Sequence, residues 1–140
     1  MSGVAAETAQ TRELLRQHIE QVWGRGDRAL LRELYAPEVV DHAPMPGQAP
    51  GVAGLEQVMD AFSTAFPDLA LTLESVLADG TLGSDRWTLR AAHLGPFLGL
   101  APTGRRVEIT GMDVVRVASG RIVEVWHTED LASALRQLTA

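Results

Sequence analysis

An aspartate and a histidine, Asp113 and His127, lie in two stretches of alternating apolar residues near the end of the chain. The segment 107–130 is typical of two strands joined by a three-residue loop, 118–120, in which Gly120 supplies the positive φ that such a loop ends on. Side chains alternate across a strand, and Asp113 falls on the more apolar face of its own strand. A loop of this length also turns His127 inward.

The length of that loop decides which residues lie opposite each other. Three loop residues pair Val117 with Arg121 and put His127 opposite Gly111, so that His127 and Asp113 are diagonal neighbours, roughly 7–8 Å apart at Cα. A two-residue loop would shift the register and put the two on opposite faces. An imidazole and a carboxylate in an apolar interior are costly unless they are paired. We therefore expect them to meet each other or one shared small molecule, as an acid–base pair.

Three more polar residues are candidates for the same interior. His93 falls on the apolar side of its strand, beside a loop rich in Gly and Pro, where it either binds loop backbone or contacts a ligand. Asp41 and His42 are adjacent, so an extended chain points only one of them inward. The spacing of these residues matches no zinc or iron motif, and we expect no metal site.

Composition excludes several classes of protein. The 140 residues correspond to one domain, 1–140, in which we expect 1–6 to be a frayed leader. There is no cysteine, which excludes disulfides and thiolate chemistry and is compatible with a cytoplasmic location. The net charge of −6 argues against a nucleic-acid or anionic-membrane partner. No apolar run reaches the roughly 20 residues of a membrane span. We expect a cytoplasmic protein.

The hydrophobic periodicity predicts an α+β fold, with helices gathered before an antiparallel meander. The sheet should be curved and packed on three N-terminal helices. The expected helices cover about 7–23, 27–35, 52–65 and 131–138, and the expected strands 38–43, 69–78, 84–93 and the two arms of the hairpin. Apolar side chains on the outer face of that hairpin predict a homodimer; they are Met112, Val114, Ile122 and Trp126.

Six short segments, in order, resemble the SnoaL-like polyketide cyclases, also called ester cyclases, of the nuclear-transport-factor-two superfamily. They are 35–42 (YAPEVVDH), 65–69 (AFPDL), 93–99 (HLGPFLG), 101–105 (APTGR), 119–126 (SGRIVEVW) and 136–138 (RQL). The resemblance spans residues 14 to 138. It implies a cone-shaped α+β barrel and closure of a ring by intramolecular aldol condensation, with no metal and no cofactor.

The resemblance also implies roles for the polar residues. The family's acid–base aspartate falls on His127 and its assisting histidine on Asp113, so the pair is swapped here, and a family asparagine aligns with Asp41. This predicts His127 as the base and Asp113 as the group that orients it. His93 or Asp41 would then hydrogen-bond the enolate oxygen of a small hydrophobic carbonyl compound. The expected substrate-binding residues are His42, Tyr35, Phe62, Phe66, Trp87 and Phe97.

Two other functions fit the same residues. A non-catalytic module would bind an apolar ligand in the cone. An epoxide-hydrolase-like or hydroxylation-assisting enzyme would use the carboxylates around an activated water.

Overall fold

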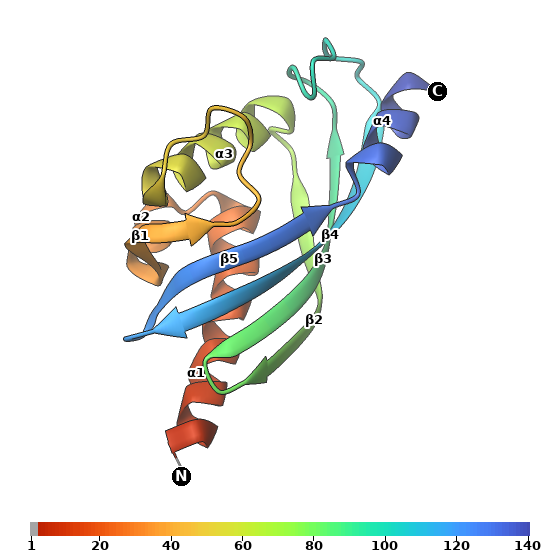
Figure 1. Cartoon of the computed structure of the whole chain (residues 1–140). Helices are drawn as coiled ribbons and strands as arrows, with labels where there is room; N and C mark the ends of the chain where they lie inside the picture. The colour runs from red at the N-terminus through yellow and green to blue at the C-terminus, as the bar shows by residue number, and fades with distance from the viewer. Residues whose placement is uncertain (1–2) are drawn as a thin grey trace.

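The computed structural model describes residues 3–140 and shows helices packed against one curved sheet (Figure 1). The elements, in chain order, are α1 (Gly3–Gln17), the π-helical η1 (His18–Trp23), α2 (Arg28–Leu34), β1 (Tyr35–Asp41), α3 (Gly51–Ala65), β2 (Ala70–Asp79), β3 (Leu82–Ala92), β4 (Arg106–Ala118), β5 (Arg121–Glu129) and α4 (Leu131–Thr139). The strands form one open sheet in the order β1-β5-β4-β3-β2. The fold is the expected cone-shaped α+β fold, with α1, α2 and α3 gathered on one side of the sheet.

The first helix differs from its prediction at both ends. It begins at Gly3 rather than near residue 7, so the leader expected to fray is helical from residue 3, and residues 1 and 2 lie outside the described residues. Its last turn is the π-helix η1, which periodicity does not distinguish from an α-helix. Because a π-turn brings residues five apart to one side, His18 and Trp23 both face the interior of the molecule.

The sheet is mixed rather than purely antiparallel. The pairs β2·β3, β3·β4 and β4·β5 are antiparallel, as expected, but β1 pairs with β5 in parallel, with Asp41 beside Val125. A parallel neighbour needs a long crossover between the two strands. The segment from α3 to β4 provides it. β1 is thereby an edge strand, and its last residue, Asp41, lies beside the middle of β5.

The turn of the β4–β5 hairpin corrects the predicted loop. Only Ser119 and Gly120 form it, with φ of 50° and 75°, which is the left-handed pair of a type I′ turn. The pairing of Val117 with Arg121 was therefore wrong. A β-bulge around residue 123 adds one residue to β5, so that Asp113 lies directly opposite His127 instead of diagonal to it. Both side chains do face inward.

The two-residue turn pairs Ile122 with Val117 on the inner face, where Ile122 is completely buried, so its predicted place on the outer face was wrong. Met112, Val114 and Trp126 are exposed on the outer face, as expected. No helix within residues 3–140 is long and apolar enough to cross a membrane.

Gly111 makes room for an aromatic side chain on the neighbouring strand. It pairs with Trp87, and a Cβ added at Gly111 would lie 2.2 Å from Cζ2 of the Trp87 ring. The indole therefore lies flat across the place where a side chain would be. A larger residue at position 111 has to displace it.

We expect Gly111→Ala to lower the free energy of unfolding by about 1–3 kcal/mol, because the added methyl overpacks the contact with Trp87. Urea denaturation followed by tryptophan fluorescence measures the change. Gly3→Ala is the matched control, since a Cβ at Gly3 meets no atom within 4 Å. Equal unfolding midpoints for the two variants would contradict the steric argument.

Candidate active site

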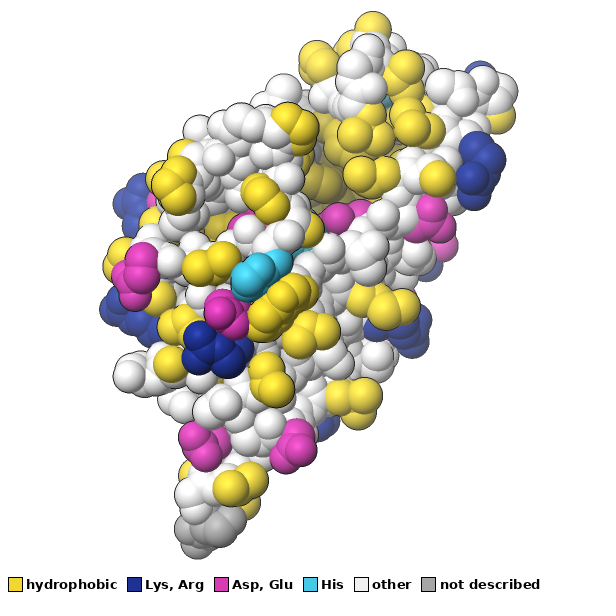
Figure 2. All heavy atoms as spheres, viewed as in Figure 1, with side chains coloured by type: hydrophobic (Ala, Val, Ile, Leu, Met, Phe, Trp, Pro, Cys, Tyr) yellow, Lys and Arg dark blue, Asp and Glu magenta, His cyan; other side chains and the backbone are white. Residues whose placement is uncertain are grey.

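A cavity lies between the helices and the inner face of the sheet, with about 710 Å³ of empty space when the open solvent at its mouth is included. One wall is apolar and is formed by Leu55, Val58 and Phe62 of α3 with Leu69, Leu71 and Leu89. Figure 2 shows hydrophobic side chains around a recess between α3 and the end of the sheet. The opposite wall carries acids and imidazoles. A molecule in the cavity would thus contact hydrocarbon on one side and charge on the other.

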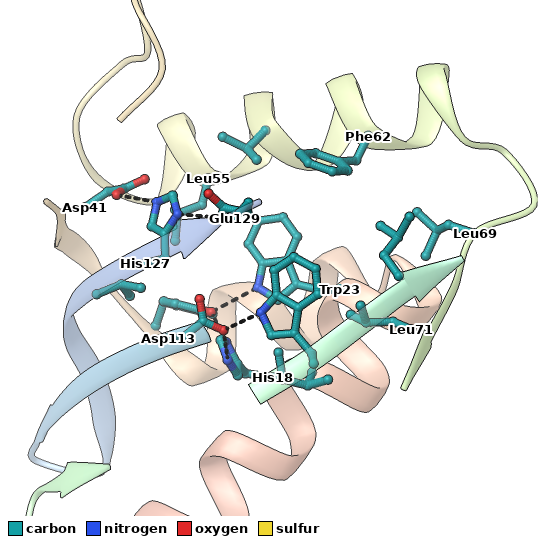
Figure 3. Close-up of a pocket in the computed structure, with 16 residues that line it drawn as sticks. His18, Trp23, Asp41, Leu55, Phe62, Leu69, Leu71, Asp113, His127 and Glu129 are labelled. Carbon is teal, nitrogen blue, oxygen red and sulfur yellow. Dashed lines mark hydrogen bonds and ion pairs between the residues drawn. The ribbon is translucent and has the colours of Figure 1, made fainter. Parts of the chain in front are cut away.

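The first polar group is centred on His127, which β5 turns into the cavity. Its Nε2 lies 2.8 Å from Oδ1 of Asp41, at the end of β1, and its Nδ1 lies 2.6 Å from Oε1 of Glu129. Figure 3 shows His127 between these two carboxylates. The Asp41 carboxylate also accepts hydrogen bonds from the Gln48 side chain and the Ala43 amide. Asp41 is thus the member of the Asp41–His42 pair that points inward.

The two carboxylates keep His127 charged. Hydrogen bonds to Asp41 and Glu129 raise the pKa of His127 to about 10, against the effect of burial. Burial acts to raise the pKa of Asp41, but the bonds from His127, Gln48 and the Ala43 amide lower it to about 2. At neutral pH this group is therefore an imidazolium between carboxylates. The state of His127 argues against the role of neutral base that the sequence predicted for it.

The second polar group lies deeper and is centred on His18. Its Nε2 lies 2.8 Å from Oδ2 of Asp85 and 3.5 Å from Oδ2 of Asp113, and its Nδ1 lies 2.5 Å from the Tyr35 hydroxyl. All four side chains are buried. The sequence-based expectation that Asp113 would pair with His127 is not met by any hydrogen bond. Instead Asp113 forms an ion pair with His18, and its Oδ2 accepts a hydrogen bond of 3.0 Å from Nε1 of Trp87.

Burial and mutual contact shift the pKa values of His18, Asp85 and Asp113. Burial acts to lower the pKa of His18, but its contacts with Tyr35, Asp113 and Asp85 raise it well above the usual value. Burial raises the pKa of Asp85 to about 7, with the Asp113 charge adding to the effect. Burial also acts to raise the pKa of Asp113, but the His18 contact lowers it. Near neutral pH, Asp113 is thus the ionised acid, whereas Asp85 keeps its proton to a higher pH than an ordinary carboxyl group does.

The other two predicted histidines lie away from the cavity. His93 is completely buried, and its Nδ1 lies 2.9 Å from Oγ1 of Thr103 and accepts the Thr103 amide hydrogen, so it holds the loop after β3. This is the loop-binding alternative of the two weighed for it. His42 is exposed and stacks on Trp126 on the outside of the sheet, with ring centroids 4.6 Å apart.

The aromatic residues expected to line the cavity are divided between two layers. Tyr35, Phe62 and Trp87 line it. Phe66 and Phe97 do not; they pack against Phe62 from behind, with ring centroids 6.0 Å and 5.7 Å from it. They support the wall without forming its surface.

One group of side chains has the composition of a metal site. His18, Asp85 and Asp113 each offer a ligand atom, and these atoms lie within 4.8 Å of one another. Each of the three side chains already has a hydrogen-bonding or ion-pair partner inside the protein. The group therefore satisfies its own charges without an ion.

Comparison with known proteins agrees with this fold. The family model of the SnoaL-like polyketide cyclases matches residues 13–138. The chain belongs to that family. No curated protein matches it.

Solved structures resemble this SnoaL-like chain over nearly its whole length. IdmH of Streptomyces antibioticus, a proposed polyketide cyclase, is 34% identical with a TM-score of 0.81, covering 94% of this chain and 99% of that one. TsrD of Streptomyces laurentii is 26% identical with a TM-score of 0.84, covering 94% and 96%. AclR of Streptomyces galilaeus, a proposed hydroxylase, is 27% identical with a TM-score of 0.81, covering 94% and 85%.

Four residues of this SnoaL-like site were missed from the sequence: His18, Trp23, Asp85 and Glu129. The first two lie in an apolar helical stripe, where a polar residue is easily taken for part of the core. Glu129 has the same strand parity as His127, two residues away, which is the signal that could have identified it. Asp85 likewise shares its face with Trp87.

The two pKa shifts around His127 predict how stability depends on pH. The folded pKa of His127 is raised, so its contribution is complete below about 6.5 and is lost as the pH rises toward about 10. Relative to His127→Gln, the wild type should therefore lose about 2 kcal/mol of unfolding free energy between pH 6.5 and 10. For Asp41 the folded pKa is lowered, so its contribution is lost as the pH falls below about 4 toward 2.

Urea denaturation of both proteins at several pH values measures this difference. His42→Gln, an exposed histidine outside the cavity, is the control and should follow the wild type. A gap between wild type and His127→Gln that stays constant from pH 6 to 10 would show that His127 carries no raised pKa.

Proposed function

We propose that this protein is a cofactor-independent acid–base enzyme that acts on a small hydrophobic carbonyl compound, by intramolecular aldol chemistry of the polyketide or ester cyclase type. The observation that carries the proposal is the direct cross-strand pairing of Asp113 and His127, both of which line one cavity with an apolar opposite wall. Directly opposed residues have Cβ atoms about 4.5–5.5 Å apart. A single carbonyl group and its α-carbon can span that separation.

The charges support a division of labour between the two. Asp113 is the ionised carboxylate and removes a proton from the carbon next to a carbonyl. The electrons of that C–H bond move into the enolate, whose oxygen is stabilised by the positive charge of His127. Both ring nitrogens of His127 are bound by Asp41 and Glu129. His127 therefore acts through its charge and keeps its protons.

Ring closure completes the reaction. The enolate carbon attacks a second carbonyl carbon of the same molecule, a C–C bond forms, and the π electrons of that carbonyl move to its oxygen. The resulting alkoxide takes up the proton that Asp113 holds, so the carboxylate is regenerated and no proton or electron is left over. These roles exchange those that the sequence predicted, because His127 is charged and Asp113 is not bound to it.

A substrate-independent probe tests the base. 5-Nitrobenzisoxazole is a small apolar ring that loses its C3 proton to a base; the C–H electrons form a nitrile and the N–O bond breaks to give a coloured phenolate. We expect the wild type to accelerate this elimination, and Asp113→Asn to lower kcat/KM by about 10²–10⁴-fold. Asp79→Asn, an exposed carboxylate at the end of β2, is the control and should match the wild type.

Two outcomes would refute the acid–base proposal. Turnover by Asp113→Asn at the wild-type rate would remove Asp113 as the base. Binding of the probe by the wild type without any turnover would favour the non-catalytic module.

We also propose that two copies of the chain pair through the outer face of the sheet, where Met112, Val114 and Trp126 are exposed. A charge in the middle of this face should separate the copies, because it would be buried without a partner. Light scattering should give twice the chain mass for the wild type and the single-chain mass for Val114→Glu. Leu94→Glu, at an exposed apolar site in the loop after β3, should remain dimeric. A monomeric wild type at micromolar concentration would exclude this dimer.

A further inference from the structure

The carboxylate of Asp113 is held asymmetrically by the protein. Its Oδ2 accepts the Trp87 Nε1 hydrogen at 3.0 Å and lies 3.5 Å from Nε2 of His18. No hydrogen bond to its Oδ1 is found among residues 3–140. Oδ2 is thus held by one hydrogen bond, from Trp87, and by an ion pair with His18, while Oδ1 is left for a molecule in the cavity that Asp113 lines.

His18 is itself fixed from both sides. Asp85 lies 2.8 Å from its Nε2 and the Tyr35 hydroxyl 2.5 Å from its Nδ1, and Trp23 donates to the same hydroxyl at 3.1 Å. The imidazole is only 2% exposed, so water cannot take over these contacts. The π-helical turn that carries it places His18 and Trp23 on one side. A rotation of the ring would break bonds at both nitrogens.

Asp85 contributes in a different way. It is the direct cross-strand partner of Asp113, on β3. Its Oδ2 contacts His18, while its Oδ1 is buried and has no hydrogen-bonding partner within residues 3–140. An unpaired buried oxygen costs more free energy on a charged carboxylate than on a neutral carboxyl group. Asp85 therefore fits the role of a neutral acceptor that orients His18 without competing for its charge.

We propose that His18, oriented by Asp85 and Tyr35, is a positioning residue that holds Asp113 ionised, with Oδ2 bound to the protein and Oδ1 presented to the substrate. The proposal rests on the proposed function, in which Asp113 is the base. The other titratable groups that line the same cavity are Asp41, His127 and Glu129, which bind one another rather than Asp113. His18 is thus the cationic group in direct contact with the base.

The pH profile of 5-nitrobenzisoxazole elimination separates positioning from general support of the fold. His18→Gln removes the cation beside Asp113. The acidic limb of the profile, where kcat/KM falls as Asp113 is protonated, should then lie about 1–3 pH units higher than in the wild type, because an adjacent opposite charge lowers a carboxyl pKa by that amount. The plateau should also fall by about 10²-fold, through misplacement of the carboxylate. Asp85→Asn keeps an oxygen acceptor for His18 but removes the carboxyl group, and should lower the plateau by less than His18→Gln does.

His93→Gln is the matched control. His93 is as deeply buried as His18 but lies outside the cavity, bound to Thr103, so it should leave the acidic limb in place. Unfolding midpoints of all variants establish which of them are folded at the pH of the assay. If His18→Gln does not fold, the proposal is tested on Tyr35→Phe, which removes the hydroxyl beside His18 and should move the limb in the same direction by a smaller amount.

The results distinguish this proposal from the one it rests on. Full activity in Asp113→Asn would overturn the proposed function. A large loss in Asp113→Asn, together with a wild-type acidic limb in folded His18→Gln, would leave the function standing and overturn the role of His18. Asp85→Asn as inactive as His18→Gln would show that Asp85 must be charged, which contradicts the neutral acceptor described above.

Discussion

Burial of charge in an apolar cavity is the constraint on which this structure depends. A carboxylate removed from water is tolerated only with a cation, a proton or several donors beside it. Asp41 and Glu129 share the imidazolium of His127, Asp113 has His18 and the Trp87 indole, and Asp85 has His18 and a raised pKa that favours its protonated form. None of these acids is left alone in the described interior. The strand order makes these pairings available, because β1, β5, β4 and β3 are successive neighbours.

The hairpin shows how far local sequence patterns reach. Alternation along 107–117 placed Asp113 on the inner face, and this is confirmed by its burial. The inward direction of His127 is also confirmed, although the loop was predicted one residue too long. A two-residue turn followed by a bulge has the same parity as a three-residue loop without one. The sequence therefore shows which side chains of the hairpin face inward. Which residues lie opposite each other depends on whether the extra residue is in the loop or in a β-bulge, and the sequence does not show this.

The partners of each polar residue could not be predicted, because they come from distant parts of the chain. His18 and Asp85 are 67 positions apart, and His127 and Asp41 are 86 apart. His18 occupies a helical stripe with Leu14, Leu15 and Ile19, and nothing local distinguishes it from a core residue. Its contacts with Asp85 of β3 and Asp113 of β4 form only in the folded chain. The fold class, which depends on the order of elements, was within reach of the sequence; the chemistry of the site was not.

The exchange of roles between Asp113 and His127 has a chemical consequence. An imidazolium held by two carboxylates is a poor base but a permanent source of positive charge, and Asp113 beside His18 is a carboxylate of reduced basicity. A weak base suffices when the acid it faces is made stronger. In the proposed reaction, the charge of His127 stabilises the enolate oxygen and so lowers the pKa of the neighbouring C–H group. A bound apolar substrate would expel water from Asp113, and loss of water raises the basicity of a carboxylate. The same apolar wall that makes the charges costly to bury therefore makes them effective once a substrate fills the cavity.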